Sequence, residues 1–418
     1  MMNQFLRAVF INSNLGLLWA GQVVAKFGES LFGMSVVFLA MELTESSTAT
    51  GFVQMSSYLP ILVFGLVAGA YIDKSSKRSV MMASDVGRAV LVALIPILFF
   101  TKLLTALLLG AIAFLIAALS AFFVPARNAV IPELASEHPE ERTVVLLKAN
   151  SLVQTSEQLA FLMAPLAVGA IGAAIGTIHL FTITAATFFT SYLFIIFIKA
   201  KEPQNTETVS IDKVLRDSLT SLKKVASNQR LRDILVITSL NNLFLMGAAI
   251  VGTPIFIKTV LNKGIETFAL IEFIFAVMML LVSFLLNVFA ERVKKIGYEK
   301  IWAFGLVMDG VSYCPYAFCN TVEQVSFFAA LHASFIILII VPRTTMIQRL
   351  VSSEDLGKVF SLQNVAVSGM TAISSAATGW LCDAIGVREV FFGIGILAGL
   401  CGVWAWRAVV VPQAKAEA

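Results

Sequence analysis

The chain carries few charged residues and few residues that bind metals. Asp, Glu, Lys and Arg make up 13% of its 418 residues, whereas soluble domains carry about 25%. A water-facing surface needs more charge than this, so the composition excludes an ordinary soluble fold. The three histidines and the four cysteines, the latter all within apolar runs, indicate neither a zinc site nor a disulfide framework.

Nucleotide-binding and catalytic motifs are missing as well. ATP-driven proteins hold phosphate in a loop that reads Gly, four residues, Gly, Lys and then Ser or Thr, and this pattern does not occur in the sequence. No catalytic triad or metal constellation is recognisable, and no polar region is long enough for a soluble domain. We therefore expect neither an enzyme nor an ATP-driven pump, and no bound cofactor.

The sequence contains instead many apolar runs of membrane length. Hydrophobic residues make up 58% of the chain, and a helix needs about 20 apolar residues to cross the hydrocarbon core. The strict alternation of transmembrane β-strands is absent. The sequence predicts an all-α membrane protein with twelve transmembrane helices, at 16–42, 51–72, 79–100, 103–124, 146–171, 177–199, 232–258, 267–290, 299–319, 323–342, 358–381 and 388–411.

Lys and Arg are distributed unequally between the predicted loops. With the N-terminus inside, 24 of the 30 basic residues fall in inner loops and four in outer loops. Short cytoplasmic loops are enriched in Lys and Arg, so we expect a multi-pass protein of a bacterial cytoplasmic membrane with both termini in the cytoplasm. The net charge of +4 is explained by this topology, and no nucleic-acid partner is expected.

The longest polar stretch, 200–231, separates six predicted helices from six. We expect an N-terminal six-helix bundle over 1–199, a cytoplasmic linker over 200–231 and a C-terminal six-helix bundle over 232–418. Apolar residues recur near helical spacing in the linker, which predicts an amphipathic helix lying on membrane lipid, with a solvated flexible linker as the alternative. These apolar residues are Ile211, Val214, Leu215, Leu222 and Val225.

The two halves repeat a motif after their second predicted helix, in which an acid and a base precede a basic pair. Parallel repeats of six helices occur in secondary transporters. The first copy resembles the loop signature of the major facilitator superfamily, with Ser76 in the place of the second glycine of that signature. The resemblance implies two pseudo-symmetric six-helix bundles. The copies are Gly69-Ala-Tyr-Ile-Asp73-Lys74-Ser-Ser-Lys77-Arg78 and Asn287-Val-Phe-Ala-Glu291-Arg292-Val-Lys294-Lys295.

Other stretches resemble the drug and siderophore efflux branch, typified by macrolide exporters and the enterobactin exporter. The resemblance implies export of a small molecule. The chain departs from the branch at Ile116, where helix 4 commonly has an Arg that aids proton coupling, and in 164–169, where the antiporter signature has lost two glycines. Both departures leave the coupling ion open. The matching stretches are Trp19-Ala-Gly-Gln22, Ser84-Asp85-Val-Gly-Arg88-Ala, Pro125-Ala-Arg-Asn128-Ala-Val-Ile-Pro132 and Gly357-Lys-Val-Phe-Ser361.

The first predicted helix carries a polar stripe. Gln22, Lys26, Glu29 and Gly33 are spaced four, three and four residues apart, which places them on one helix face. An ionisable side chain at this depth costs about 2.5–3.5 kcal/mol, so it is expected to face a cavity or a partner. We expect Glu29 to bind the coupled proton, with a purely structural ion pair to Lys26 as the alternative.

The other candidates for binding substrate or proton lie on several helices. Asn150, Gln154 and Glu157 form a second stripe, with structural hydrogen bonds between helices as the alternative. For Asp309 we expect a structural role, because the resemblance places its helix at the periphery, away from the cavity. The candidates in the second half are Asn241, Asn242, Glu272, Gln363 and Asn364.

The motif after the second helix is expected to have a gating role. The resemblance implies a charge network near the inner membrane surface that holds the two halves together when the protein faces outward. Asp73 is expected close to the helix that begins after Gly357, where the helix dipole favours a carboxylate. The gating residues are Gly69, Asp73, Lys74, Lys77, Arg78, Asp85 and Arg88.

Together these features favour a monomeric secondary transporter that exports a lipophilic or siderophore-like molecule by alternating access. The proton gradient is the expected energy source. A lipid or lysolipid flippase of the same fold is one alternative, and a membrane receptor or scaffold that transports nothing is another. Paired polar stripes disfavour the last, because a scaffold has no need of carboxylates at mid-membrane depth.

Overall fold

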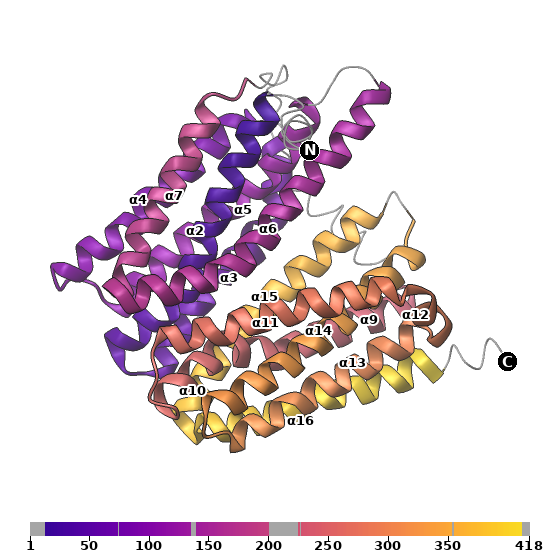
Figure 1. Cartoon of the computed structure of the whole chain (residues 1–418). Coiled ribbons are helices and arrows are strands. Elements are labelled where there is room, and N and C mark those ends of the chain that lie inside the picture. The colour runs from indigo at the N-terminus through magenta and orange to yellow at the C-terminus, as the bar shows by residue number, and fades with distance from the viewer. Residues whose placement is uncertain are drawn as a thin grey trace.

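The computed structural model describes residues 13–73, 75–134, 139–199, 225, 227–352 and 355–411. Within these residues the chain forms helices and no strand. Figure 1 shows the helices gathered in two bundles, one from each half of the sequence.

The N-terminal bundle contains six long helices. Apolar side chains cover their surfaces almost all round, as lipid-embedded helices require. The helices are α2 (Ser13–Thr44), α3 (Ser47–Asp73), α4 (Lys77–Phe100), α5 (Ala106–Leu134), α6 (Pro139–Ile175) and α7 (Ile178–Ile196).

The C-terminal bundle repeats this plan with six further helical segments, some of them interrupted. The first segment contains a π-helical turn, a feature that often occurs at functional sites. The segments are α9 (Gln229–Gly247), continued by the π turn η1 (Ala248–Gly252) and by α10 (Thr253–Thr259); α11 (Ile265–Val288); α13 (Tyr298–Tyr313), continued by the 3₁₀ turn η2 (Cys314–Phe318); α14 (Val322–Leu350); α15 (Leu356–Ile385); and α16 (Val387–Ala405), continued by the π turn η3 (Trp406–Val410). The short helix α12 (Ala290–Ile296) lies between α11 and α13 and carries the second copy of the basic motif.

The predicted fold class is confirmed: the chain is an all-α membrane protein with two six-helix bundles. Each of the twelve predicted runs corresponds to a helical segment. Ten of the described helical segments are long and apolar enough by length and composition to cross a membrane. The other two, α3 and α13, pack against neighbouring helices in the two bundles. The predicted surface helix of the linker lies almost wholly outside the described residues.

Two predicted helix ends were wrong, and both stood next to a proline. The fourth helix was predicted to end at 124 but continues through Pro125 to Leu134, and the tenth was predicted to end at 342 but continues through Pro342 to Leu350. Membrane helices tolerate internal proline, because neighbouring helices satisfy the backbone groups that it frees. As a result Arg127 and Arg343, which the predicted topology assigned to loops, lie on membrane helices.

The two bundles form a V (Figure 1). They meet at the lower left of the view, near α10, and separate towards the end at which the described chain begins and ends. We call these the closed end and the terminal end. Two seams join the bundles, one between α3 and α15 and the other between α6 and α11.

Glycines allow the helix backbones of the first seam to approach closely. A Cβ atom added at Gly51 of α3 would lie 2.5 Å from the carbonyl oxygen of Ser375 and 3.0 Å from the Cα atom of Gly379, both in α15. Small residues let membrane helices pack backbone against backbone. The seam therefore holds the bundles together at the closed end.

Two charged side chains also cross between the bundles at the closed end. The Asp383 carboxylate, on the last turn of α15, accepts hydrogen bonds from the backbone N–H groups of Ser47 and Thr48 at 3.0 and 2.8 Å, and from the Thr48 hydroxyl at 2.7 Å. The Lys258 ammonium, on α10, donates to the backbone carbonyl of Met41 at 2.9 Å, in the last turn of α2. An anion thus meets a helix N-terminus and a cation meets a helix C-terminus, the arrangement that helix dipoles favour.

Candidate functional site: a cavity between the bundles

A cavity of about 730 Å³ lies between the two bundles. Its lining comes from α2, α3 and α6 of the first half and from α9 to α11 and α13 to α15 of the second. Sites for small molecules usually measure about 300–1,000 Å³. The cavity therefore has the size of a site for one small organic molecule.

The wall of the cavity is mainly apolar and aromatic. Rings and thioethers face the space from both halves, and such side chains suit a lipophilic or aromatic ligand of irregular shape. They include Met34, Tyr58, Phe161, Met246, Phe268, Phe275, Met279, Tyr313, Tyr316 and Phe360.

Five of the predicted site residues lie in this wall. Asn241 and Asn242 come from α9, Glu272 from α11, and Gln363 and Asn364 from α15. The Asn242 amide also donates to the backbone carbonyl of Thr238 at 2.8 Å. The structure places these side chains where a ligand could meet them, while their binding roles remain predictions.

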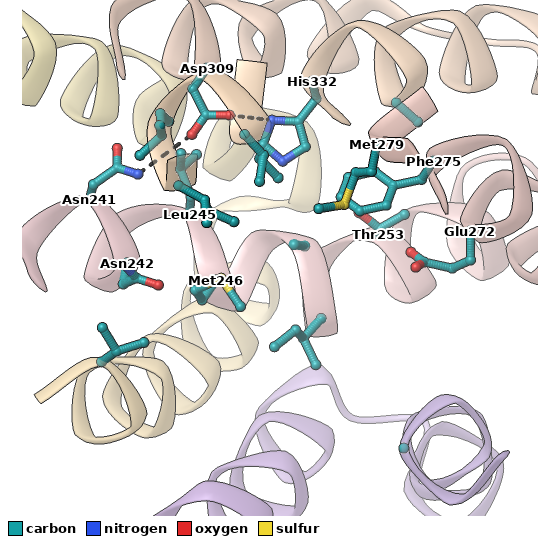
Figure 2. Close-up of a pocket in the computed structure, with 18 of the residues that line it drawn as sticks. Asn241, Asn242, Leu245, Met246, Thr253, Glu272, Phe275, Met279, Asp309 and His332 are labelled. Carbon is teal, nitrogen blue, oxygen red and sulfur yellow. Dashed lines mark hydrogen bonds and ion pairs between the residues drawn. The ribbon is translucent and has the colours of Figure 1, made fainter. Parts of the chain in front are cut away.

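Ionisable side chains line the cavity on the C-terminal side. Figure 2 shows Asp309 of α13 between Asn241 and His332, and Glu272 at the right of the view. Glu272 and Arg343 both line the cavity, and neither has a hydrogen bond or ion pair with another described residue. The cavity thus contains a carboxylate and a guanidinium that ligands can reach.

The expected peripheral position of Asp309 was wrong. The cavity extends between α9 and α14 as far as α13, so this carboxylate forms part of the wall. His332 and Arg343 were not predicted as site residues at all. The sequence did contain a signal for both, because His332 lies in an apolar run and Arg343 directly follows one. Arg343 was missed because it follows Pro342, which was taken as the end of the helix.

The polar stripe of α2 lies mostly outside the cavity wall. Only Gly33 lines the cavity, and a Cβ atom at this position would have no neighbour within 4 Å. The carboxylate of Glu29 pairs with Lys26 at 2.7 Å and with Arg88 at 2.6 Å. Both contacts lie within the N-terminal bundle, as the structural alternative requires.

Glu29 belongs to a charge cluster that is buried in the N-terminal bundle. Arg88, with 0% of its side chain exposed, ion-pairs with Asp85 as well as with Glu29. Its guanidinium lies over the rings of Phe123 and Phe188, 4.4 Å from each centroid. Asp85 and Arg88 therefore pair with each other and with Glu29 inside one bundle, while their predicted position near the inner membrane surface and their gating role remain predictions.

A second polar group in the N-terminal bundle centres on Arg127. Its Nη1 donates to the side-chain oxygen of Gln22 at 3.1 Å and contacts the Glu157 carboxylate at 3.5 Å. This cluster joins α2, α5 and α6. Asn150 and Gln154, on the same helix as Glu157, are exposed and lie outside the cavity wall.

The remaining gating residues are described only in part. Lys77 pairs with Glu133 at 2.6 Å, and Arg78 donates to the carbonyls of Ile195 and Ile196 at the end of α7. These contacts stay within the N-terminal bundle. Lys74, the surroundings of Gly69 and the side chain of Asp73 lie outside the described part of the structure, so the proposed contact of Asp73 with α15 remains a prediction.

Two six-helix bundles around a shared cavity define the class of membrane transporters that are built from parallel repeats. A family model of the Major Facilitator Superfamily matches residues 18–337 and 265–418. The chain belongs to this superfamily.

Relatives and solved structures agree with that assignment. Macrolide efflux protein A of Streptococcus pyogenes is 24% identical over 402 residues, which cover 91% of this chain and 92% of that protein. Multidrug efflux pump Tap of Mycolicibacterium fortuitum is 30% identical over 181 residues, 42% of this chain and 43% of that protein. The nucleoside transporter NupG superposes with a TM-score of 0.74 at 12% identity, over 95% of this chain and 100% of the other. A bacterial homolog of the human lysosomal transporter Spinster, in an inward-facing and unoccupied conformation, superposes with a TM-score of 0.73 at 11% identity. The match covers 94% of this chain and 96% of that chain.

Proposed function

We propose that this transporter exports a lipophilic small molecule by alternating access, driven by proton antiport. The observation that carries the proposal is the cavity, which both bundles line, together with the side-chain contacts that join the bundles at the closed end. Rocking of the two bundles about such a site would open it to the other side.

The membrane orientation predicted from Lys and Arg agrees with loading of substrate from the cytoplasm. With both termini in the cytoplasm, the terminal end of the V faces the cytoplasm (Figure 1). An exporter loads its substrate from that side. The relatives named for macrolide and multidrug efflux support the same direction and the same kind of substrate.

The alternatives that the sequence left open gain no support from the geometry. A lipid flippase needs a wide lateral opening, whereas contacts along both seams join the described parts of the bundles. A scaffold needs no cavity of this size. We therefore keep both alternatives only as outcomes of the transport experiment.

The experiment is transport in proteoliposomes that carry an internal pH dye. Erythromycin, ethidium, a catecholate siderophore and a fluorescent phospholipid would be supplied in turn, with and without an imposed pH gradient. Erythromycin or ethidium movement that the gradient drives, with matching proton flux, is the expected result. Phospholipid movement alone would indicate the flippase, transport that ignores the gradient would exclude proton antiport, and no transport of any probe would favour the scaffold.

Filling the cavity at Gly33 is expected to block transport without disturbing the fold. Replacing Gly33 with Phe puts a ring into open space in the cavity wall, so transport of erythromycin should fall at least about tenfold, the effect of losing about 1.4 kcal/mol of binding. The matched control is Gly393→Phe, because a Cβ atom at Gly393 also has no neighbour within 4 Å but Gly393 does not line the cavity. Equal transport by the two variants would show that this cavity is not the substrate path.

A further inference from the structure

His332 and Asp309 form a buried pair in the wall of the cavity. His332 Nδ1 lies 2.7 Å from Asp309 Oδ1, and the two residues are 4% and 1% exposed. The other carboxylate oxygen of Asp309 accepts a hydrogen bond from the Asn241 amide at 3.5 Å. The ring of Tyr313 packs edge-on against the imidazole at 4.5 Å between centroids, so the pair is held from α9, α13 and α14.

The neighbours of Nδ1 indicate which ring nitrogen is free. The hydroxyl of Ser312 donates its only proton to the backbone carbonyl of Asp309 at 2.6 Å, so towards Nδ1, 3.4 Å away, it can only accept. The Asp309 carboxylate is an acceptor too. We assign the N–H to Nδ1 because both neighbours of this nitrogen can accept a hydrogen bond, and this assignment leaves the lone pair on Nε2.

Nε2 is turned away from Asp309, and His332 lines the cavity (Figure 2). Without a proton on Nε2, the pair has the single negative charge of Asp309. With a proton there, imidazolium and carboxylate together are neutral. Uptake of one proton thus removes the net charge of the pair.

We propose that the His332–Asp309 pair is the group that takes up and releases the coupled proton, with Nε2 as the receiving atom and Asp309 as the positioning residue. The inference rests on the proton antiport proposed above. The step is a plain proton transfer, in which the lone pair of Nε2 binds a proton from cavity water and later returns it to water on the other side of the membrane. No other bond forms or breaks.

The carboxylates of the N-terminal bundle are placed less well for this task. Glu29 already has two cationic partners and Glu157 has Arg127, and neither lines the cavity. Substrate in the cavity, by contrast, lies in the same space as Nε2. A substrate that occupies this edge of the ring hinders protonation, and a proton on Nε2 removes the acceptor that the substrate would use. This mutual exclusion is what antiport requires.

Other charged and titratable groups surround the pair and share the cavity. Tyr313 and Tyr316 come from α13 and the turn after it, Glu272 from α11, and Arg343 from the same helix as His332. The helix α9 contributes the neutral Asn241. Among these described neighbours Glu272 is the one carboxylate and Arg343 the one guanidinium.

The test compares His332→Gln and Asp309→Asn with wild type in proteoliposomes. Two rates are measured with erythromycin: proton flux that depends on the substrate, and exchange of labelled for unlabelled erythromycin without a gradient, which needs no net proton movement. We expect both variants to lose the proton flux and the gradient-driven transport but to keep exchange. The matched control, His179→Gln, makes the same change at a histidine outside the cavity wall and should leave both rates unchanged.

The outcomes separate this inference from the proposed function. Wild type without proton flux would overturn antiport and the inference together. Wild type with flux that survives unchanged in His332→Gln would overturn the inference alone. If the variants fail to fold, NMR of the imidazole signals gives a second measurement. The signal of His332 is assigned with a variant that lacks the other two histidines, and its protonation is then followed in wild type. An Nε2 that gains no proton at any pH at which the protein transports substrate would contradict the proposal.

Discussion

Replacing Arg88 with Met is expected to lower the free energy of unfolding of the N-terminal bundle by about 3–5 kcal/mol, the usual effect of removing one partner from a buried charge cluster. The guanidinium pairs with Asp85 and Glu29 and donates to the Ser120 hydroxyl at 3.2 Å. Without it, Asp85, 0% exposed, would be an unpaired carboxylate in the membrane interior. Thermal unfolding of the purified protein in detergent measures the loss.

Two further variants test this explanation. Adding Asp85→Asn to Arg88→Met removes the stranded charge, so part of the lost stability should return. Arg407→Met makes the same substitution at an exposed residue and should change stability by no more than about 0.5 kcal/mol. An Arg88→Met protein that unfolds at the wild-type temperature would show that the cluster contributes nothing to stability.

Asp383→Asn is expected to open the closed end of the V. The carboxylate accepts hydrogen bonds from Ser46, just before α3, and from Ser47 and Thr48 in its first turn, all in the other bundle. Hydrogen bonds to a charged group contribute about 1.5–3 kcal/mol. Because Asp383 is exposed, we take about 2 kcal/mol for all of its hydrogen bonds together. Their loss should shift the equilibrium between the closed and open forms by about 30-fold. Spin labels at positions 45 and 385, in a cysteine-free background, would report the distance between the bundles.

The second contact between the bundles provides an independent check. Lys258→Met removes the cation from the end of α2, so it should shift the same distances in the same direction. Asp233→Asn is the matched control, because the ion pair of Asp233 with Arg232 lies within one helix. Identical distances in wild type and Asp383→Asn would show that the glycine seam alone keeps the end closed.

The fold could be predicted because each helix satisfies its own backbone in the membrane. Every apolar run of sufficient length therefore forms a helix, whatever it packs against. The same reasoning failed at Pro125 and Pro342, where the run continued beyond a residue that usually ends a helix in water. This error hid Arg127 and Arg343, because both were counted as loop residues.

The site was predicted less well, since spacing along one helix does not reveal the partner helix. The stripe of Gln22, Lys26 and Glu29 does lie on one helix face, but Arg88 and Arg127 of other helices meet it inside the bundle. In the second half, Asn241 and Glu272 were predicted and do line the cavity. Asp309 and His332 are 23 positions apart and lie on different helices, so no periodicity along one helix indicates their pairing.

By itself the sequence determined the membrane environment, the number of helical segments and their division into two halves. These properties depend on the burial of apolar side chains in lipid and on the distribution of charge along the chain, and both can be read locally. Only the tertiary structure decided which polar side chains neutralise one another and which remain open to a ligand. That outcome depends on distances of a few ångströms between different helices, because a charge in a medium of low dielectric constant is stabilised only by partners in direct contact.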